Sequence, residues 1–258
     1  MMKLLEKFQF LIHRKHCQKI NLEFPTAWEE MDPKDFEEVC KLLVTPRPRE
    51  ETLFLAFCKL AHIRPDNPKI YPSVPKGMSP YIVNGQAHFI GHSVIAEGCR
   101  QVSFILDGTG FPPAPFHQVD RKLYGVSFEK FYEADSLIMR AAVENNDGYL
   151  KEAAKILTNH AKRKLVPWER KALVIWWNGL KMYLKGLYPY VFTEEETITN
   201  KTQGEILLDL LSVMNGQQPQ QNEHILKTDV HTVLHELNLI YHNAKQKISA
   251  NGAGRPAR

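Results

Sequence analysis

Three histidines near the end of this chain have a spacing that could support metal binding. His231, His235 and His242 are separated by four and seven residues, which places them along one side of a helix. Two histidines four residues apart can share a zinc ion, but the site needs a further ligand from another element. His235 precedes Glu236, yet Leu239 occupies the position where the zinc-protease motif requires its second histidine. We therefore expect a solvated or partner-facing histidine row without a metal or other cofactor.

Two other sets of residues could support enzyme chemistry. His88 and His92 fall on the same side of a predicted strand, and His117 follows in the loop beyond it. Asp135 stands on an otherwise apolar helical stripe, where a buried carboxylate needs a partner. A structural ion pair is the usual partner, and a role as general acid or base is the exception. A metal- or acid/base-dependent enzyme that uses these central histidines or Asp135 is therefore an alternative function.

The densest basic cluster lies at positions 162–171. It combines five cations with an aromatic ring that could stack on a base: Lys162, Arg163, Lys164, Arg170 and Lys171 beside Trp168. However, the formal charge of the chain is only +4, from 33 basic and 29 acidic residues. This bias is too small to indicate nucleic-acid binding by itself. A nucleic-acid-binding module is a second alternative, and solvated charges at a helix boundary are the simpler interpretation.

Tryptophans are the candidate anchors for a protein partner. Tryptophan is enriched among the residues that contribute most to protein interfaces. We therefore assign partner binding to Trp168, Trp176, Trp177 and the histidines at 231, 235 and 242. Core packing competes with this assignment for Trp176 and Trp177, because apolar residues surround them in the sequence.

Composition is that of an ordinary globular protein. The chain has 258 residues, of which 43% are hydrophobic, and can bury a core without disulfide bonds. Cys40 and Cys58 fall on apolar helix faces and are expected to be buried thiols. The longest apolar run, 172–177, is far shorter than the roughly twenty residues that cross a bilayer. Charged residues interrupt the N-terminal segment too often for an export signal, so we expect a soluble protein.

Local patterns predict two short helices and then a small sheet. Asp32-Pro33 begins the first helix, and the second spans 50–62. Five prolines between 64 and 80 favour an extended connection, and Asn84-Gly85 supplies the two-residue turn of a hairpin over 81–90. A further strand is expected at 102–106.

The remaining sequence is helical in pattern. Helices are expected at 128–142, 150–157, from Pro167 to Tyr188, at 206–214 and at 230–244. The fold class is therefore mainly α within α+β, with a helical hairpin (1–63), a Pro-rich connection with a small antiparallel sheet (64–120), a C-terminal helical bundle (121–250) and a disordered tail (251–258).

Four segments of the chain have a recognisable pattern: 24–31 (Phe-Pro-Thr-Ala-Trp-Glu-Glu-Met), 131–135, 188–192, and 206–238 with Val230, Leu234, Glu236, Leu237 and Asn238. Together these segments resemble a group of poorly characterised proteins encoded in the tail-gene clusters of phages and prophages of Bacteroidetes. The Pro-rich region 64–116 is less similar. The resemblance implies a non-enzymatic role in tail assembly or as a structural subunit. Its partners would be other tail or virion proteins or a second copy, and the protein could be incorporated in the virion.

Overall fold

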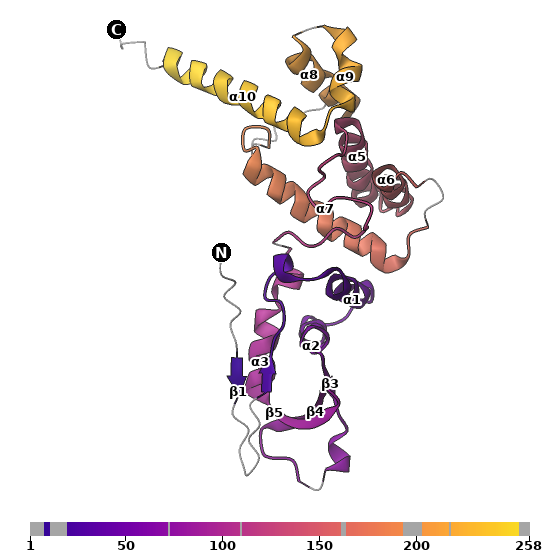
Figure 1. Ribbon diagram of the computed structural model, residues 1–258, viewed down its shortest axis with the longest axis vertical. Helices are drawn as coiled ribbons and strands as arrows, with labels where there is room; N and C mark the ends of the chain where they lie inside the picture. Colours follow the sequence, from indigo (N-terminus) through magenta and orange to yellow (C-terminus); the bar gives the residue numbers. More distant parts are fainter. Residues whose placement is uncertain are drawn as a thin grey trace. The chain divides into compact units, whose positions relative to one another are not determined.

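The computed structural model describes residues 8–10, 20–71, 73–108, 110–160, 164–192, 203–216 and 218–252 (Figure 1). These residues form a mainly helical α+β fold with a small three-stranded antiparallel sheet, as the sequence predicts. No helix within the described ranges is long and apolar enough to cross a membrane.

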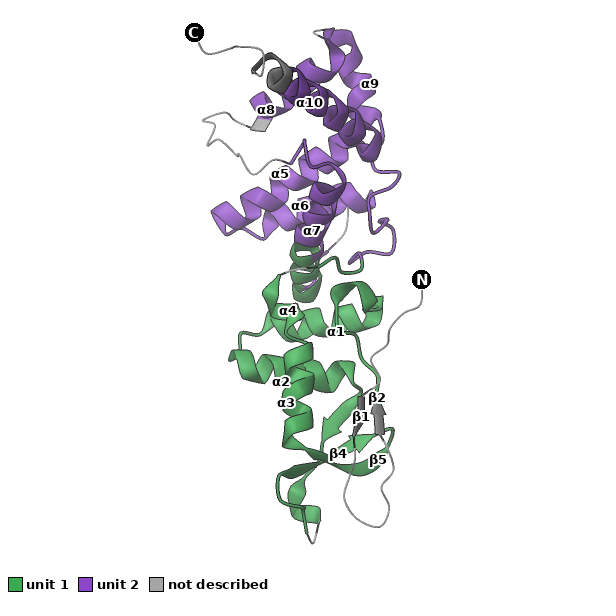
Figure 2. Ribbon diagram, turned by 90° about the vertical axis from the view of Figure 1, so that its left-hand side faces the viewer, with its two compact units in different colours: residues 1–113, 167–175 green, residues 114–166, 176–258 purple. Residues whose placement is uncertain are grey.

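The chain divides into two compact units (Figure 2). Unit 1 comprises residues 1–113 and 167–175, and unit 2 comprises residues 114–166 and 176–258. The predicted boundary at 63 therefore falls inside unit 1, and nine residues of the predicted C-terminal bundle belong to unit 1. Most of the predicted tail, 253–258, lies outside the described residues, while Gly252 is the last residue of the final helix.

Unit 1 contains all strands of the described chain and four complete α-helices. Its elements are β1 (Phe8–Phe10), β2 (Ile20–Leu22), η1 (Trp28–Glu30), α1 (Pro33–Val44), α2 (Arg49–Leu60), β3 (Ile63–Pro65), η2 (Pro68–Ile70), β4 (Met78–Val83), β5 (Gln86–Gly91), α3 (His92–Gln101) and α4 (Phe104–Asp107). The expected helix start at Asp32 is confirmed, because its carboxylate accepts the backbone N–H of Asp35 at 2.7 Å. α1 and α2 pack together as the predicted hairpin.

The predicted β-hairpin is also confirmed. β4 and β5 pair antiparallel from Met78↔Gly91 to Val83↔Gln86, and β3 pairs with the other edge of β4. Asn84 and Gly85 have φ angles of 50° and 79°, which are the left-handed values that this two-residue turn requires.

The strand expected at 102–106 is wrong, and so is the placement of His92 in a strand. His92 begins α3, and the segment after it continues into α4. Ile95, Val102 and Ile105 are buried at helical spacing. A short apolar run such as 102–106 fits either a strand or a buried helix, and here it forms α4, with Phe104 packed edge-on against Trp28 and Ile105 buried.

Unit 2 is helical. Its elements are α5 (Phe128–Glu144), α6 (Gly148–Thr158), α8 (Gln203–Asn215), η3 (Pro219–Gln221), α9 (Asn222–Lys227) and α10 (Val230–Gly252). α5 and α6 pack together as predicted, across a turn where Asn145 adopts φ 49°. α9 was not predicted, because its sequence follows a Gln- and Pro-containing break that resembles a linker.

One long helix, α7 (Pro167–Leu187), contributes to both units. It begins at Pro167 and ends before Tyr188-Pro189, as the sequence predicts. Its fully buried side chains recur along one side: Ala172, Leu173, Trp176, Trp177, Leu180 and Leu184. The helix is therefore a core element, although Val174 and Ile175 are only half-buried.

Candidate functional site

The first turn of α10 holds a buried histidine that joins three segments of unit 2. His231 is only 8% exposed. Its Nε2 lies 2.7 Å from the carbonyl oxygen of Lys122, and its Nδ1 lies 2.8 Å from the hydroxyl of Tyr188. A carbonyl can only accept, so Nε2 carries a proton and donates it. Burial raises the pKa of Tyr188, which keeps its hydroxyl protonated beside Nδ1 of His231.

The loop at residues 120–125 is fixed by side chains that bind its backbone. The Asp120 carboxylate accepts the N–H groups of Lys122 and Tyr124 at 2.8 and 3.1 Å. The Asp229 carboxylate accepts the N–H of Gly125 at 2.7 Å. Each of these bonds orients one peptide group, so together they define the path of the loop.

Further contacts from α7 and α10 hold the same loop. The indole N–H of Trp176 donates to the carbonyl of Arg121 at 3.0 Å. Leu123 is fully buried and has φ 68°, a left-handed value that is rare for a leucine. This conformation costs about 1–2 kcal/mol, which the surrounding contacts must offset.

Two tyrosines and a lysine form the outer surface above His231. Tyr124 is 56% exposed, and its ring stacks on the His231 ring with centroids 4.4 Å apart. A hydrogen bond with Tyr183 raises the pKa of Tyr124. The Lys122 ammonium lies 5.2 Å from the centre of the Tyr183 ring. We call Lys122, Tyr124 and Tyr183 the tyrosine platform.

The chain after α7 packs on the polar side of α10. The backbone N–H of Tyr190 donates to the side-chain oxygen of Asn238 at 2.9 Å. The centres of the Tyr190 and His242 rings are 4.6 Å apart. The Lys245 ammonium lies 6.0 Å from the centre of the Tyr190 ring. The polar side of α10 therefore binds residues of its own chain over two turns.

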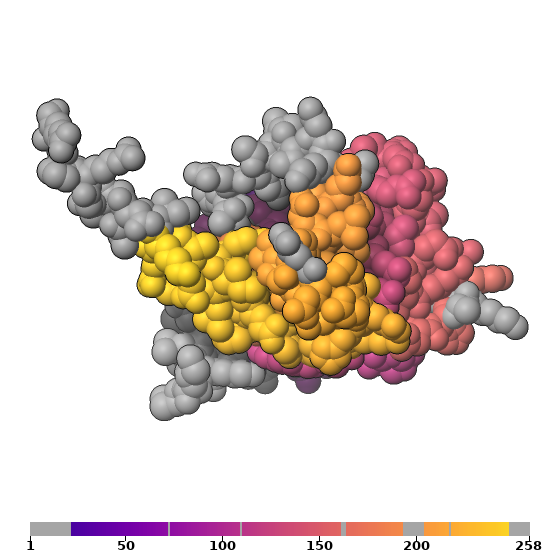
Figure 3. All heavy atoms as spheres, turned by 90° about the horizontal axis from the view of Figure 1, so that it is seen from above, coloured from indigo at the N-terminus to yellow at the C-terminus, as the bar shows by residue number. Residues whose placement is uncertain are grey.

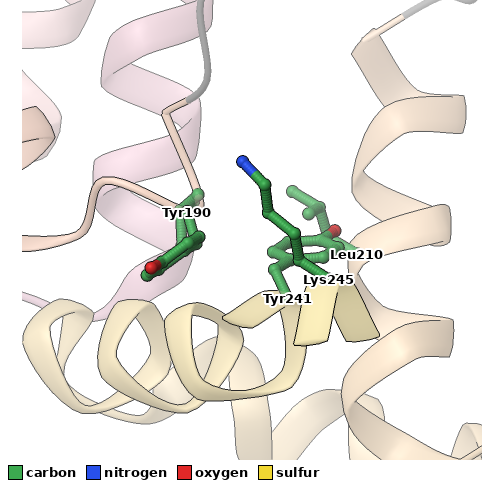
Figure 4. A pocket seen from close by; sticks show the side chains of 5 residues that line it. Tyr190, Leu210, Tyr241 and Lys245 are labelled. Atoms are coloured by element: carbon green, nitrogen blue, oxygen red, sulfur yellow. The ribbon is translucent and has the colours of Figure 1, made fainter. Parts of the chain in front are cut away.

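A pocket opens beside this contact. It has a volume of about 330 Å³ and is lined by Tyr190, Val191, Leu210, Tyr241 and Lys245 (Figure 4). Burial, and then the negative charge of Asp209, raise the pKa of Tyr241. The volume of the pocket lies at the lower end of the range of about 300–1,000 Å³ that is typical of small-molecule sites.

α8 is strongly apolar, and much of its apolar surface is exposed. Leu211 is buried, but Leu208, Val213 and Ile206 are 61%, 40% and 36% exposed. Ile206, Leu210 and Val213 follow one another at spacings of four and three, so they form one stripe along the helix. Figure 3 shows α8 and α9, in orange, lying beside α10, in yellow.

The three tryptophans that were predicted to bind a partner differ in how far they are buried. Trp176 and Trp177 are 0% and 1% exposed, so they belong to the core, as the competing interpretation expected, and cannot serve as surface anchors. Trp168 is half-buried in unit 1, with the Lys41 ammonium 6.0 Å from its ring.

The three histidines of α10 do not form one solvated row. His231 is buried, against the prediction, because both of its ring nitrogens have partners in unit 2. His235 is exposed, and His242 is half-buried beside Tyr190. The spacing placed His231 correctly on the helix but could not reveal the carbonyl of Lys122, which lies 109 positions earlier in sequence.

The residues of the enzyme alternative do not come together. Within the described ranges, no three His, Cys, Asp or Glu side chains are arranged to hold a metal ion. His92 is at the start of α3 with its Nε2 3.0 Å from the Ser79 hydroxyl. Asp135 accepts the indole N–H of Trp177 at 2.8 Å and lies 3.1 Å from the Lys181 ammonium. Asp135 therefore has the structural ion pair that was the favoured interpretation.

Only part of the basic cluster can be described. Lys162 and Arg163 lie outside the described residues, whereas Lys164 and Lys171 are exposed and Arg170 is half-buried. Their arrangement as one surface is therefore not defined.

Comparison with known proteins gives no relative for this chain: no family model, no curated protein and no solved structure matches it. Sequence reasoning did not single out the tyrosine platform or the pocket. The available signal was Asp120 followed by Gly125, which marks a turn, but the partners of that turn come from α7 and α10.

Proposed function

We propose that this protein is a non-enzymatic, tail-associated protein of a phage or prophage that acts through contacts with other proteins. It would function in the cytoplasm of the producing bacterium, either as a tail-assembly factor or as a structural subunit incorporated in the virion. The observation that carries the protein-binding part is the apolar surface of α8, where Leu208 is 61% exposed in a helix that is rich in leucine.

Exposed apolar groups on a helix favour association with another protein. Transfer of apolar surface from water is worth roughly 25 cal/mol per Å², and contiguous exposed patches commonly mark protein interfaces. α10 adds Leu239 and Ile240, which are 46% and 36% exposed. Two helices of unit 2 thus carry apolar side chains that the described part of the chain leaves accessible to a partner.

The fixed polar groups of unit 2 support a binding role over a catalytic one. Asp135, the carboxylate of the enzyme alternative, joins two helices, and the buried His231 holds a loop in place. A general acid or base must instead reach a substrate. The tail context has a separate basis, which is the resemblance of segments such as 24–31 and 188–192 to tail-cluster proteins.

The proposal is tested by affinity purification of the tagged protein from its native producer, followed by mass spectrometry and size-exclusion chromatography. Tail or virion subunits should co-purify in a stable complex. The variant that combines Ile206→Glu with Val213→Glu places charge on the apolar stripe of α8, and the recovery of those subunits should fall by about tenfold or more.

The variant that combines Met139→Glu with Val143→Glu is the matched control. Met139 and Val143 are 47% and 85% exposed and lie one turn apart on α5, so two glutamates add the same charge to another helix of unit 2. The control should retain the partners. Equal recovery with the α8 variant, or a monomer that co-purifies with a metal or a metabolite, would contradict the proposal.

A further inference from the structure

The walls of the pocket in unit 2 are mostly apolar. Val191 and Leu210 contribute aliphatic side chains, and Tyr190 and Tyr241 contribute aromatic rings. All four side chains are half-buried, so part of each remains accessible. Figure 4 shows Tyr190 on one side of the open space and Leu210 and Tyr241 on the other. The chain after α7, α8 and α10 therefore present apolar surface to one shared space.

The charged groups at the pocket have opposite signs. Lys245 lines the pocket, and its ammonium lies 6.0 Å from the centre of the Tyr190 ring. Asp209 on α8 is close enough to Tyr241 for its negative charge to contribute, after burial, to the raised pKa of the phenol. A positive and a negative charge together attract an ion of neither sign. The ligand that fits this pocket is therefore one without a formal charge.

The two tyrosine rings favour an aromatic ligand over an aliphatic one. Aromatic rings pack on one another in offset or edge-to-face arrangements, which are more favourable than the buried apolar area alone would give. An ammonium such as that of Lys245 is also attracted to the face of a ring. An aliphatic ligand would gain neither contribution.

The pocket is continuous with the apolar stripe of α8. Leu210 lines the pocket and stands between Ile206 and Val213 on this stripe. Ile206 and Val213 are 36% and 40% exposed. A protein segment that packs along the stripe therefore passes the pocket and can place one of its side chains there. Partner segments commonly bind between helices through such anchor side chains.

We propose that this pocket binds an uncharged aromatic side chain of the protein that packs on α8. The ring of that side chain packs against Tyr190 and Tyr241, and Leu210 covers it from the side of α8. This inference rests on the proposed protein-binding function, and it names the type of residue with which the partner is anchored.

The test uses a defined probe, N-acetyl-phenylalaninamide, titrated into the full-length protein with tyrosine rings labelled for NMR. The corresponding amides of N-acetylated alanine, lysine and glutamate are the controls without a ring or with a charge. Binding of the aromatic probe, with a Kd on the order of 1 mM, should shift the ring signals of Tyr190 and Tyr241. Because the probe is uncharged, its binding should not weaken as salt rises. Each control probe should bind at least about tenfold more weakly.

Three variants locate the site. Leu210→Ala removes part of the wall and should weaken binding of the aromatic probe by about threefold or more. Leu208→Ala is the matched control, because Leu208 is 61% exposed and points away from Leu210 on the same helix. It should leave binding unchanged. Tyr241→Phe keeps the ring and should retain binding, whereas a site that depended on the phenol would lose it. Unchanged amide spectra elsewhere in unit 2 show that the fold of each variant is intact.

The outcome separates this inference from the proposed function. The variant that combines Ile206→Glu with Val213→Glu should lose its protein partner and still bind the uncharged probe, because Leu210 and both tyrosines remain. Equal binding of the alanine probe, tighter binding of a charged probe, or equal effects of Leu210→Ala and Leu208→Ala would overturn the pocket as an aromatic site. An aromatic small molecule that co-purifies with the protein in this pocket would overturn the partner as the source of the ring. None of the probe results would affect the evidence for a partner of α8.

Discussion

The two units of this protein are stabilised in different ways. Unit 1 has an aromatic core in which Trp28 makes edge contacts with Phe36 and Phe104, and Phe57 packs directly on the backbone of α3 at Gly98. Unit 2 also has an apolar core, but its segments are joined in addition by polar side chains such as the half-buried Asp135 and the buried His231. The stability of unit 1 therefore comes from the close packing of apolar side chains, whereas the stability of unit 2 comes in addition from specific hydrogen bonds.

We infer from this difference that unit 1 serves as a stable scaffold and that unit 2 binds partners. Close apolar packing specifies a stable scaffold but leaves few polar groups to present. Hydrogen bonds from side chains to a loop can hold that loop in a strained conformation and fix an exposed residue such as Tyr124. We therefore look for partner binding in unit 2 and expect substitutions in unit 1 to act on stability alone.

The largest effect is expected from Gly98→Val in unit 1. A Cβ atom at Gly98 would overlap the Phe57 ring, so α2 and α3 would have to separate. We expect a loss of about 3 kcal/mol or more in the free energy of unfolding. Urea unfolding measures the loss, and hydrogen exchange read by peptide mass spectrometry should assign it to unit 1.

Gly186→Val is the control for this prediction. Nothing lies within 4 Å of a Cβ at Gly186, which is also a helical glycine. The control should be neutral or slightly stabilising, because glycine is a poorer helix former than valine. Equal stability of the two variants would show that the contact of Gly98 with Phe57 is not tight.

His231→Ala tests the hydrogen bonds of unit 2. It leaves the carbonyl of Lys122 and the hydroxyl of Tyr188 without their partner, at a cost of about 1–3 kcal/mol. His235→Ala removes an exposed imidazole one turn later and should change stability by less than about 0.5 kcal/mol. Hydrogen exchange should increase in unit 2 only, and an increase confined to unit 1 would refute the comparison.

Asp135→Asn should have a smaller effect in the same unit. The amide keeps an oxygen for the indole N–H of Trp177 but removes the charge that faces Lys181. We expect a loss of about 1 kcal/mol by thermal unfolding, because the ion pair is partly exposed and the hydrogen bond remains. A rise in stability would show that the charge of Asp135 destabilises the fold instead of stabilising it.

Local signals determined which parts of the fold could be predicted. The Asp32 cap, the Asn84-Gly85 turn and the proline at 167 each act within a few residues, and their elements are confirmed. α3 was missed because its apolar positions are few and His92 fitted the alternation of the preceding strand.

The candidate site depends on contacts that are distant in sequence. His231 appeared to belong to a polar row because its spacing matches that of His235, and only the carbonyl of Lys122 and the hydroxyl of Tyr188 explain its burial. Leu123 carries no sign in its residue type of a left-handed conformation, which is usual for glycine or asparagine. The platform therefore could not have been found from the sequence.

The smallest predicted effect concerns an ion pair on the surface of unit 1. Hydrogen bonds from Lys59 and then Lys41 lower the pKa of Glu38 from 4.5 to about 2, and the contact with Lys59 joins α2 to α1 at 2.8 Å. A carboxyl group with a lowered pKa in the folded state stabilises the fold above its unfolded pKa. That contribution is lost as the pH falls from 4.5 toward 2.

Glu38→Gln should therefore lower stability slightly at pH 7, by less than about 1 kcal/mol, and should make unit 1 less sensitive to acid between pH 4.5 and 2. Glu152→Gln, which removes an ion pair within α6, is the control in unit 2 and should leave the acid sensitivity of unit 1 unchanged. Thermal unfolding across this pH range, combined with hydrogen exchange, measures both. Parallel pH profiles for the wild-type protein and Glu38→Gln would mean that the link between α1 and α2 contributes nothing, and that unit 1 is held by apolar packing alone.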